Sequence, residues 1–187
     1  MNSRKVALIA VLTAVSIGSN YAMVSLYNVK FMDLVVFVSG FCFGPVAGVL
    51  VGVFSWAIYG SLNPLGFSLP IWFATMFSES IYGLVGALVR RIVSPLEFGS
   101  FRNWRLSTGV FFGFLGLFLT FVYDLVTNIV FGYVSNLDVA FAVVFGFATF
   151  GLVHMVSNAF FFGIGCVPMI NALLKITGGE GNGVSEE

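Results

Sequence analysis

Two carboxylates lie in the middle of long apolar runs of this 187-residue chain. Asp124 interrupts the stretch LTFVYDLVTNIVFG, and no lysine or arginine lies near it in the sequence. Glu79 lies in a second apolar run, residues 70–89. A carboxylate within a lipid bilayer is costly and normally faces a cavity or the interior of a helix bundle. Both residues are therefore candidates for a binding site.

Other polar side chains repeat at helical spacing around these acids. Asn128 lies one helical turn after Asp124, and His154 and Asn158 form a similar pair in a third apolar run. At a rise of about 1.5 Å per residue, Glu79 and Asp124 lie at similar depths below the ends of their helices. We expect these five residues to line one pocket that opens to the outside. Three aromatic side chains are placed to stack on a ligand there: Trp72, Tyr82 and Tyr123.

The same residues could have structural roles or other chemical roles instead of binding a ligand. A lone His is often a packing residue, Asn side chains bridge helices in membranes, and Asp124 and Glu79 can share one proton in a structural contact. One His, two carboxylates and no nearby Cys suit a transition metal poorly, so we expect no metal and no other cofactor. Ser157 and His154 lie three residues apart on one helix, which makes no catalytic triad, and we expect no enzyme.

The composition requires a membrane around the elements that carry these residues. Hydrophobic residues make up 59% of the chain, charged residues only 9%, and the mean hydropathy is +1.03. A soluble domain is nearer one quarter charged, so this chain has too few polar side chains to cover a globular surface. A net charge of zero gives no indication of a nucleic-acid partner. The chain is therefore an integral membrane protein.

Hydropathy and the breaks at Gly and Pro predict an all-α bundle of six transmembrane helices in residues 1–176. The second predicted span is short, so it tilts, reaches part way or packs inside the bundle. The last is too long for one straight crossing, and we expect a bend with the span proper beginning near Gly151. Residues 177–187 are predicted to form a short disordered acidic cytoplasmic tail. The spans are Val6–Leu26, Phe31–Phe43, Val46–Leu62, Pro70–Val89, Ser107–Tyr133 and Phe141–Leu174.

Positively charged residues predict the orientation of the bundle. Arg4 and Lys5 precede the first span, four arginines lie between the fourth and fifth, and Lys175 ends the sixth. All of these fall inside if both termini are cytoplasmic, whereas Lys30 falls outside, beside Asp33. We therefore expect a multi-pass protein of the plasma membrane with both termini in the cytoplasm.

Small residues form two faces that favour close helix packing. Ala10 and Ala14 lie four apart in the first span, and Gly48 and Gly52 follow a Gly-Pro pair at residues 44–45. Internal packing is the ordinary role of such patterns. The chain has no Gly-x-x-x-x-Gly-Lys-Ser/Thr motif for ATP, so uphill transport would draw on an ion gradient or on another chain.

With these features the chain resembles a known family, the substrate-binding S components of energy-coupling factor (ECF) vitamin transporters. The resemblance covers about Arg4 to Lys175 and rests on chain length, six predicted spans and three motifs. The motifs are Ala10-x-x-x-Ala14, Phe43-Gly44-Pro45-x-x-Gly48-x-x-x-Gly52 and Tyr123-Asp124-x-x-Thr127-Asn128.

The resemblance implies a function and its partners. An S component binds a vitamin or related micronutrient with high affinity near the outer surface, and delivers it inward with a transmembrane coupling protein and two ABC ATPases. On this chain, Ala10 and Ala14 become the surface that docks on the coupling protein, and residues 28–33 become a candidate lid. The pocket candidates become Asp124, Asn128, Glu79, His154 and Asn158.

The choice of substrate is narrowed by two further features. The chain starts Met-Asn-Ser, without the Met-His terminus by which nickel and cobalt members of the family bind their metal, so a metal substrate is disfavoured. Two acids, two amides and aromatic faces suit a neutral or cationic heteroaromatic compound. Two alternatives remain: a solitary proton-coupled carrier that uses Glu79 and Asp124, and a structural or assembly subunit without a ligand.

Overall fold

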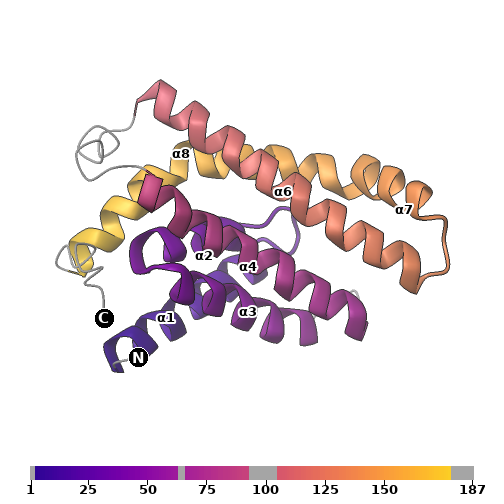
Figure 1. Cartoon of the computed structure of the whole chain (residues 1–187), viewed down its shortest axis with the longest axis horizontal. Helices are drawn as coiled ribbons and strands as arrows, with labels where there is room; N and C mark the ends of the chain where they lie inside the picture. Colours follow the sequence, from indigo (N-terminus) through magenta and orange to yellow (C-terminus); the bar gives the residue numbers. More distant parts are fainter. Residues whose placement is uncertain (1–2, 63–65, 93–104, 178–187) are drawn as a thin grey trace.

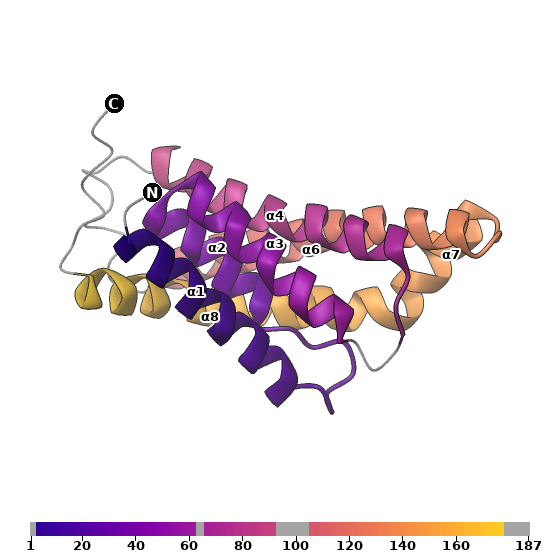
Figure 2. The same ribbon diagram turned by 90° about the horizontal axis from the view of Figure 1, so that it is seen from below.

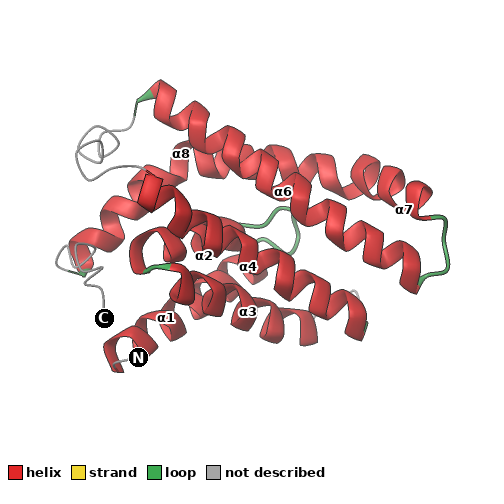
Figure 3. Cartoon of the chain, in the orientation of Figure 1, coloured by secondary structure: helices red, strands yellow, loops and turns green. Residues whose placement is uncertain are grey.

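All regular elements in the described part of the chain are helices. The computed structural model describes residues 3–62, 66–92 and 105–177, and each of the six predicted spans overlaps at least one helix (Figures 1 and 3). The all-α fold class is confirmed. Outside the described residues lie the Met-Asn start, residues 178–187 of the predicted tail, and Arg102, which is one of the four arginines between the fourth and fifth predicted spans. The elements are α1 (Ser3–Ala22), α2 (Met32–Phe43), α3 (Pro45–Ser61), α4 (Leu69–Ile92), α6 (Leu106–Val134), α7 (Val139–Gly146), the π-helix η1 (Phe147–Gly151) and α8 (Leu152–Ile176).

Four helical segments of the described chain are long and apolar enough to cross a membrane. They are α1, α4, α6 and the continuous 38-residue segment Val139–Ile176, which includes α7, η1 and α8. α2 and α3 are also apolar but contain only 12 and 17 residues. Large apolar side chains such as Phe114 and Phe77 are about two-thirds exposed, at 69% and 67%. Such side chains face lipid in a membrane bundle, in agreement with the composition.

α2 lies inside the bundle, which settles the question raised by its short length. Every residue from Met32 to Cys42 is buried, and α2 contacts α1, α3, α4 and α8. Twelve residues rise about 18 Å, less than the hydrocarbon thickness of about 30 Å. The first turn of α2, with Asp33, therefore begins within the bundle.

Glycines bring α2, α3 and α4 into backbone contact. Gly44 has φ = 89°, in the left-handed region that favours glycine, and turns the chain from α2 directly into α3. A Cβ on Gly48 would lie 2.7 Å from the Cα atoms of Gly40 and Gly83. A Cβ on Gly52 would lie 3.2 Å from the α4 backbone. The predicted face of Gly48 and Gly52 is therefore an internal packing face.

The first helix ends earlier than its apolar run. α1 ends at Ala22 rather than at Leu26, and the chain turns through residues 23–28 up to Asn28, whose φ is 51°. Hydropathy does not mark this end because the turn is itself apolar. Its side chains line a cavity instead of continuing a helix.

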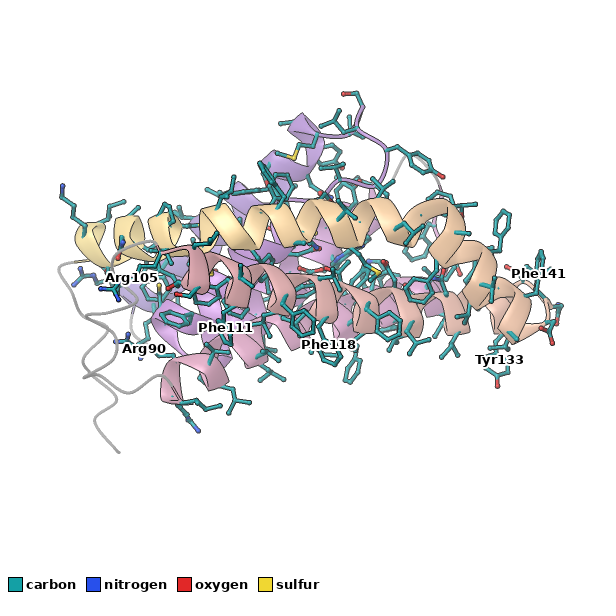
Figure 4. The ribbon with its side chains drawn as sticks, turned by 90° about the horizontal axis from the view of Figure 1, so that it is seen from above. Arg90, Arg105, Phe111, Phe118, Tyr133 and Phe141 are labelled. Carbon is teal, nitrogen blue, oxygen red and sulfur yellow. The ribbon has the colours of Figure 1, made fainter. Side chains whose placement is uncertain are left out.

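The final helical segment bends at η1, close to the predicted position. Figure 4 shows α7 running at an angle to α8, with the change of direction at the junction between them. A π-turn inserts one extra residue into the helix, which is a common cause of a kink. α8 begins at Leu152, directly after the predicted start of the span at Gly151. Pro168 lies inside α8, and the helix continues past it.

The bundle has a basic end and a loop end (Figures 1 and 2). The start of α1, the end of α4, the start of α6 and the end of α8 lie together at the basic end. In Figure 4, Arg90 and Arg105 lie at this end, and Tyr133 and Phe141 lie at the other. The end of α3, the start of α4 and the α6–α7 connection lie towards the loop end. The helix termini at the basic end carry Arg4, Lys5, Arg90, Arg91, Arg105 and Lys175.

Candidate functional site

A cavity of about 540 Å³ lies between the loop after α1 and the helices α3 and α6. This volume is within the range of small-molecule sites, about 300–1,000 Å³. Its walls combine aliphatic and aromatic side chains with a few polar groups, which is the usual composition of a ligand pocket. The lining residues are Asn20, Met23, Val24, Leu26, Tyr27, Asn28, Val29, Lys30, Trp56, Tyr59, Thr75, Tyr123, Asp124, Thr127, Asn128 and Phe150.

Three of the lining residues carry buried polar atoms without a hydrogen-bond partner in the described part of the chain. These atoms are Asn20 Oδ1, Tyr123 Oη and Asp124 Oδ2. The three residues are only 2%, 3% and 6% exposed. A buried polar atom left unpaired costs about 1–3 kcal/mol, so each such atom calls for an explanation. All three atoms belong to residues that line the cavity, so the cavity wall offers polar groups to a ligand.

Lys30 reaches into the same cavity from the loop. Its Nζ lies 4.9 Å from the ring centre of Tyr123 and 5.2 Å from that of Trp56, which are cation–π distances. None of the ion pairs in the described part of the chain involves Lys30. The sequence places Lys30 in an outer loop, but the structure turns its ammonium inward over two aromatic rings.

A buried chain of Asp33, His154 and Asp124 lies behind the cavity. His154 Nδ1 is 3.0 Å from Asp124 Oδ1, and His154 Nε2 is 2.8 Å from Asp33 Oδ2. His154 and Asp33 are 0% exposed. Each ring nitrogen faces a carboxylate oxygen, so a proton lies in both contacts. The imidazole of α8 thus joins α2 to α6 and leaves Asp124 Oδ2 without a partner among the described residues.

The polar network continues away from the cavity towards α4. Asn158 Nδ2 donates to Asp33 Oδ2 at 2.5 Å and to Thr120 Oγ1 at 2.7 Å. Tyr82 Oη donates to the same Thr120 Oγ1 at 2.9 Å. The Thr120 hydroxyl in turn donates to the carbonyl of Gly116 at 2.8 Å. Four helices are therefore tied together by one buried network around Asp33.

The loop over the cavity is fastened to η1. Asn28 Nδ2 donates to the Phe150 carbonyl at 2.9 Å. The Tyr27 ring stacks on the Phe150 ring, with 5.0 Å between their centres. The predicted lid, residues 28–33, therefore divides into two parts. Residues 28–30 cover the cavity, whereas Met32 and Asp33 belong to the buried α2.

A family model agrees with this architecture. The model of the ECF transporter substrate-specific component matches residues 4–164. The chain belongs to this family. Members of the family bind the substrate of a transporter and work with a coupling protein and ATPases; they are not known for catalysis. No solved structure matches this S component.

Glu79 and Trp72 of this S component lie outside the cavity, although both were predicted to line it. Glu79 is fully buried, and its Oε2 accepts a hydrogen bond from Trp56 Nε1 at 3.0 Å. Glu79 thus fixes the indole that faces Lys30. Trp72 Nε1 donates to the Ala57 carbonyl at 3.3 Å, and its ring lines a separate recess of about 30 Å³. The predicted depth of Glu79 does not bring it to the cavity, because the Trp56 side chain lies against its carboxylate.

The eight predicted binding residues of the S component fall into two groups. Tyr123, Asp124 and Asn128 line the cavity. The other five lie behind or beside it: Glu79, His154, Asn158, Tyr82 and Trp72. Sequence reasoning missed the inward role of Lys30 and the buried position of Asp33. The signal for Asp33 was its place at the start of a run in which Ser39 is the one polar residue, the sequence after Leu34 being VVFVSGF.

Proposed function

We propose that this chain is the substrate-specificity subunit of an ECF-type ABC importer. It binds a vitamin or related ring-containing micronutrient from outside and delivers it inward with a transmembrane coupling protein and two ATPases. The observation that carries the proposal is the cavity of about 540 Å³, with three buried polar atoms that lack partners among the described residues. Family membership supports the same role.

The charge distribution supports an orientation for this subunit. Arg and Lys side chains gather at the basic end, which the positive-inside rule assigns to the cytoplasm. Both termini then lie in the cytoplasm, the six helices form a multi-pass bundle in the plasma membrane, and the loop of residues 23–31 faces outward. The cavity beneath that loop receives substrate from the outside.

The exposed face of α1 supports a docking role for Ala10 and Ala14. Both residues are exposed, and Ala7 and Gly18 lie on the same face. A Cβ on Gly18 would meet no atom within 4 Å. Small residues on an open helix face let a second transmembrane helix approach closely. This face is the proposed contact with the coupling protein.

Two alternative functions fit the site less well. A solitary proton-coupled carrier was expected to use Glu79 and Asp124 together, but Glu79 is bonded to Trp56 and does not line the cavity. A structural subunit without a ligand was expected to have a pocket that is collapsed or filled by its own side chains, which does not match a cavity of about 540 Å³. Uptake by the chain alone in proteoliposomes would instead support the function of a solitary carrier.

The proposal is tested by mass spectrometry of small molecules released from the purified, detergent-solubilised protein. We expect a stoichiometric vitamin-like compound in the wild type and its loss in Asp124→Asn, with affinity lower by roughly 10- to 100-fold because a charged acceptor is removed. Asp138→Asn is the matched control. Asp138 caps α7 on the surface by accepting from the Phe141 amide, and Asn serves equally well there. Unchanged affinity in a folded Asp124→Asn protein would contradict the proposal.

A further inference from the structure

We infer that the substrate of this cavity is a compact ring compound that carries an anionic group at one end and N–H or O–H donors at the other. This inference rests on the proposed function, since it assigns a chemical class to the ligand of the same cavity. It replaces the expectation of a neutral or cationic compound. Four groups carry it: Lys30, Asn20, Asp124 and the aromatic pair Trp56 and Tyr123.

The aromatic surface that would attract a ligand cation is already occupied. Trp56 and Tyr123 have ring centres 6.2 Å apart, and the Lys30 ammonium lies about 5 Å from both, at 5.2 Å and 4.9 Å. Glu79 fixes the Trp56 indole from behind through the Nε1 contact of 3.0 Å. The chain thus supplies its own cation to this surface. A cationic ligand placed there would meet the positive charge of Lys30.

The Lys30 ammonium has donors to offer. An ammonium has three N–H donors, and no hydrogen bond or ion pair from Lys30 exists in the described part of the chain. The side chain is half-buried and lines the cavity. Charge-assisted hydrogen bonds to a carboxylate or phosphate are about twice as strong as neutral ones. An anionic group on the ligand is therefore the best partner for Lys30.

The remaining polar atoms of the cavity require donors. Asn20 Oδ1 and Asp124 Oδ2 are acceptors without partners among the described residues. Asp124 cannot turn away, because its Oδ1 is held by His154 Nδ1 at 3.0 Å. A ligand with N–H or O–H groups satisfies both acceptors. Asp124 and Lys30 thus recognise opposite chemical features of one molecule.

The other walls of the cavity indicate the shape and polarity of the central part of the ligand. Met23, Val24, Leu26 and Val29 supply aliphatic surface, and Tyr27 and Phe150 supply a stacked pair of rings. Such surfaces favour a flat apolar body of modest size. Sugar-like compounds, which have polar groups all round, do not fit these walls.

The inference is tested with a mixture of natural small molecules, so that no single ligand has to be chosen beforehand. Purified protein in detergent is equilibrated with the small-molecule fraction of yeast extract, and retained compounds are identified by mass spectrometry. We expect the wild type to enrich ring compounds with a carboxylate or phosphate. Lys30→Gln should lose them, with affinity lower by roughly 10- to 100-fold, and Lys30→Arg should keep them in part. Lys175→Gln, the same substitution at the basic end, is the matched control and should behave as the wild type.

A second experiment removes the negative charge of the ligand instead of the positive charge of Lys30. Once a retained acid is known, its primary amide is compared with it by thermal stabilisation of the wild type, and we expect the acid alone to stabilise. Retention of a neutral or cationic ring compound, or equal retention by a folded Lys30→Gln protein, overturns the inference and leaves the proposed function standing. If the wild type retains no compound at all, the inference fails, while the family membership of the chain stands.

Discussion

His154 holds two carboxylates that come from different helices. Asp33 belongs to α2 and Asp124 to α6, and each contacts one nitrogen of the same ring. When one partner of a buried ionic contact is removed, the other is left without compensation, at a cost of about 3–5 kcal/mol. His154 is the one histidine of the chain, so no other imidazole can take its place.

The contacts of His154 with the two carboxylates contribute to the stability of the folded bundle. His154→Gln and Asp33→Asn should each lower the free energy of unfolding by about 3 kcal/mol, because each leaves buried polar groups unpaired. The double variant should cost less than the sum, since both changes disrupt the same contact. Thermal unfolding of the four proteins in one detergent measures this cycle. Strictly additive effects would show that the two residues act independently.

The residues of the cavity could be predicted only in part. Asp124 and Asn128 are visible in the sequence because polar residues are rare in the middle of a long apolar span. Lys30 and Asp33 lie at the start of a short span, where charged residues normally face water. Their direction depends on α2 being buried, and burial of a short helix is a property of the whole bundle. Sequence pattern therefore found the deep polar residues and missed those beside the loop.

At the scale of elements, η1 and α6 fit together through glycine. The two ends of the bend carry Gly146 and Gly151. Gly146 packs against the side-chain amide of Asn128, and a Cβ on Gly151 would lie 3.3 Å from Asp124 Oδ2. A larger residue at position 146 would collide with Asn128, and one at position 151 would collide with the Phe147 ring and crowd Asp124. The sequence predicts a bend here from the glycines, but not a π-turn, because the apolar run continues through it without interruption.

The exposed small residues of α1 predict where the coupling protein docks. Replacement of both Ala10 and Ala14 by Leu should abolish uptake in cells that contain the coupling protein and ATPases, while substrate binding by the purified variant stays within about twofold of wild type. Bulky side chains prevent the close approach of a second helix, whereas both alanines lie on the exposed face of α1 and do not line the cavity.

Ala140→Leu is the control for this prediction. Ala140 is also exposed but lies in the first turn of α7, at the loop end. It should leave both uptake and binding unchanged. Full uptake by the Ala10→Leu, Ala14→Leu protein would place the coupling contact on another surface.

At the scale of the whole molecule, the two ends of the bundle differ in charge and in structure. The basic end carries Arg and Lys at four helix termini, and the loop end carries the cavity and the loop above it. The hydropathy pattern predicts this division well, because it depends on the order of spans and charges rather than on side-chain direction. The lengths of α2 and α3 could not be judged in the same way, since buried short helices and membrane spans have similar composition.

Orientation gives a prediction that can be measured in intact cells. Both native cysteines, Cys42 and Cys166, are buried. A cysteine introduced at the exposed Ser25, in the loop after α1, should react with a membrane-impermeant maleimide from outside. A cysteine at the exposed Ser107, in the first turn of α6, should react only after the membrane is permeabilised. The reverse pattern would place the cavity on the cytoplasmic side.

The buried position of Asp33 has a consequence for how the protein is made. Its partners His154 and Asn158 come 121 and 125 residues later in the chain. Helices are synthesised from the N-terminus onwards, so α2 is made long before α8. During that interval Asp33 has neither partner, and an unpaired carboxylate does not settle in hydrocarbon. The hydrogen bonds of Asp33 at the centre of the bundle are therefore completed only after the last helix has been made.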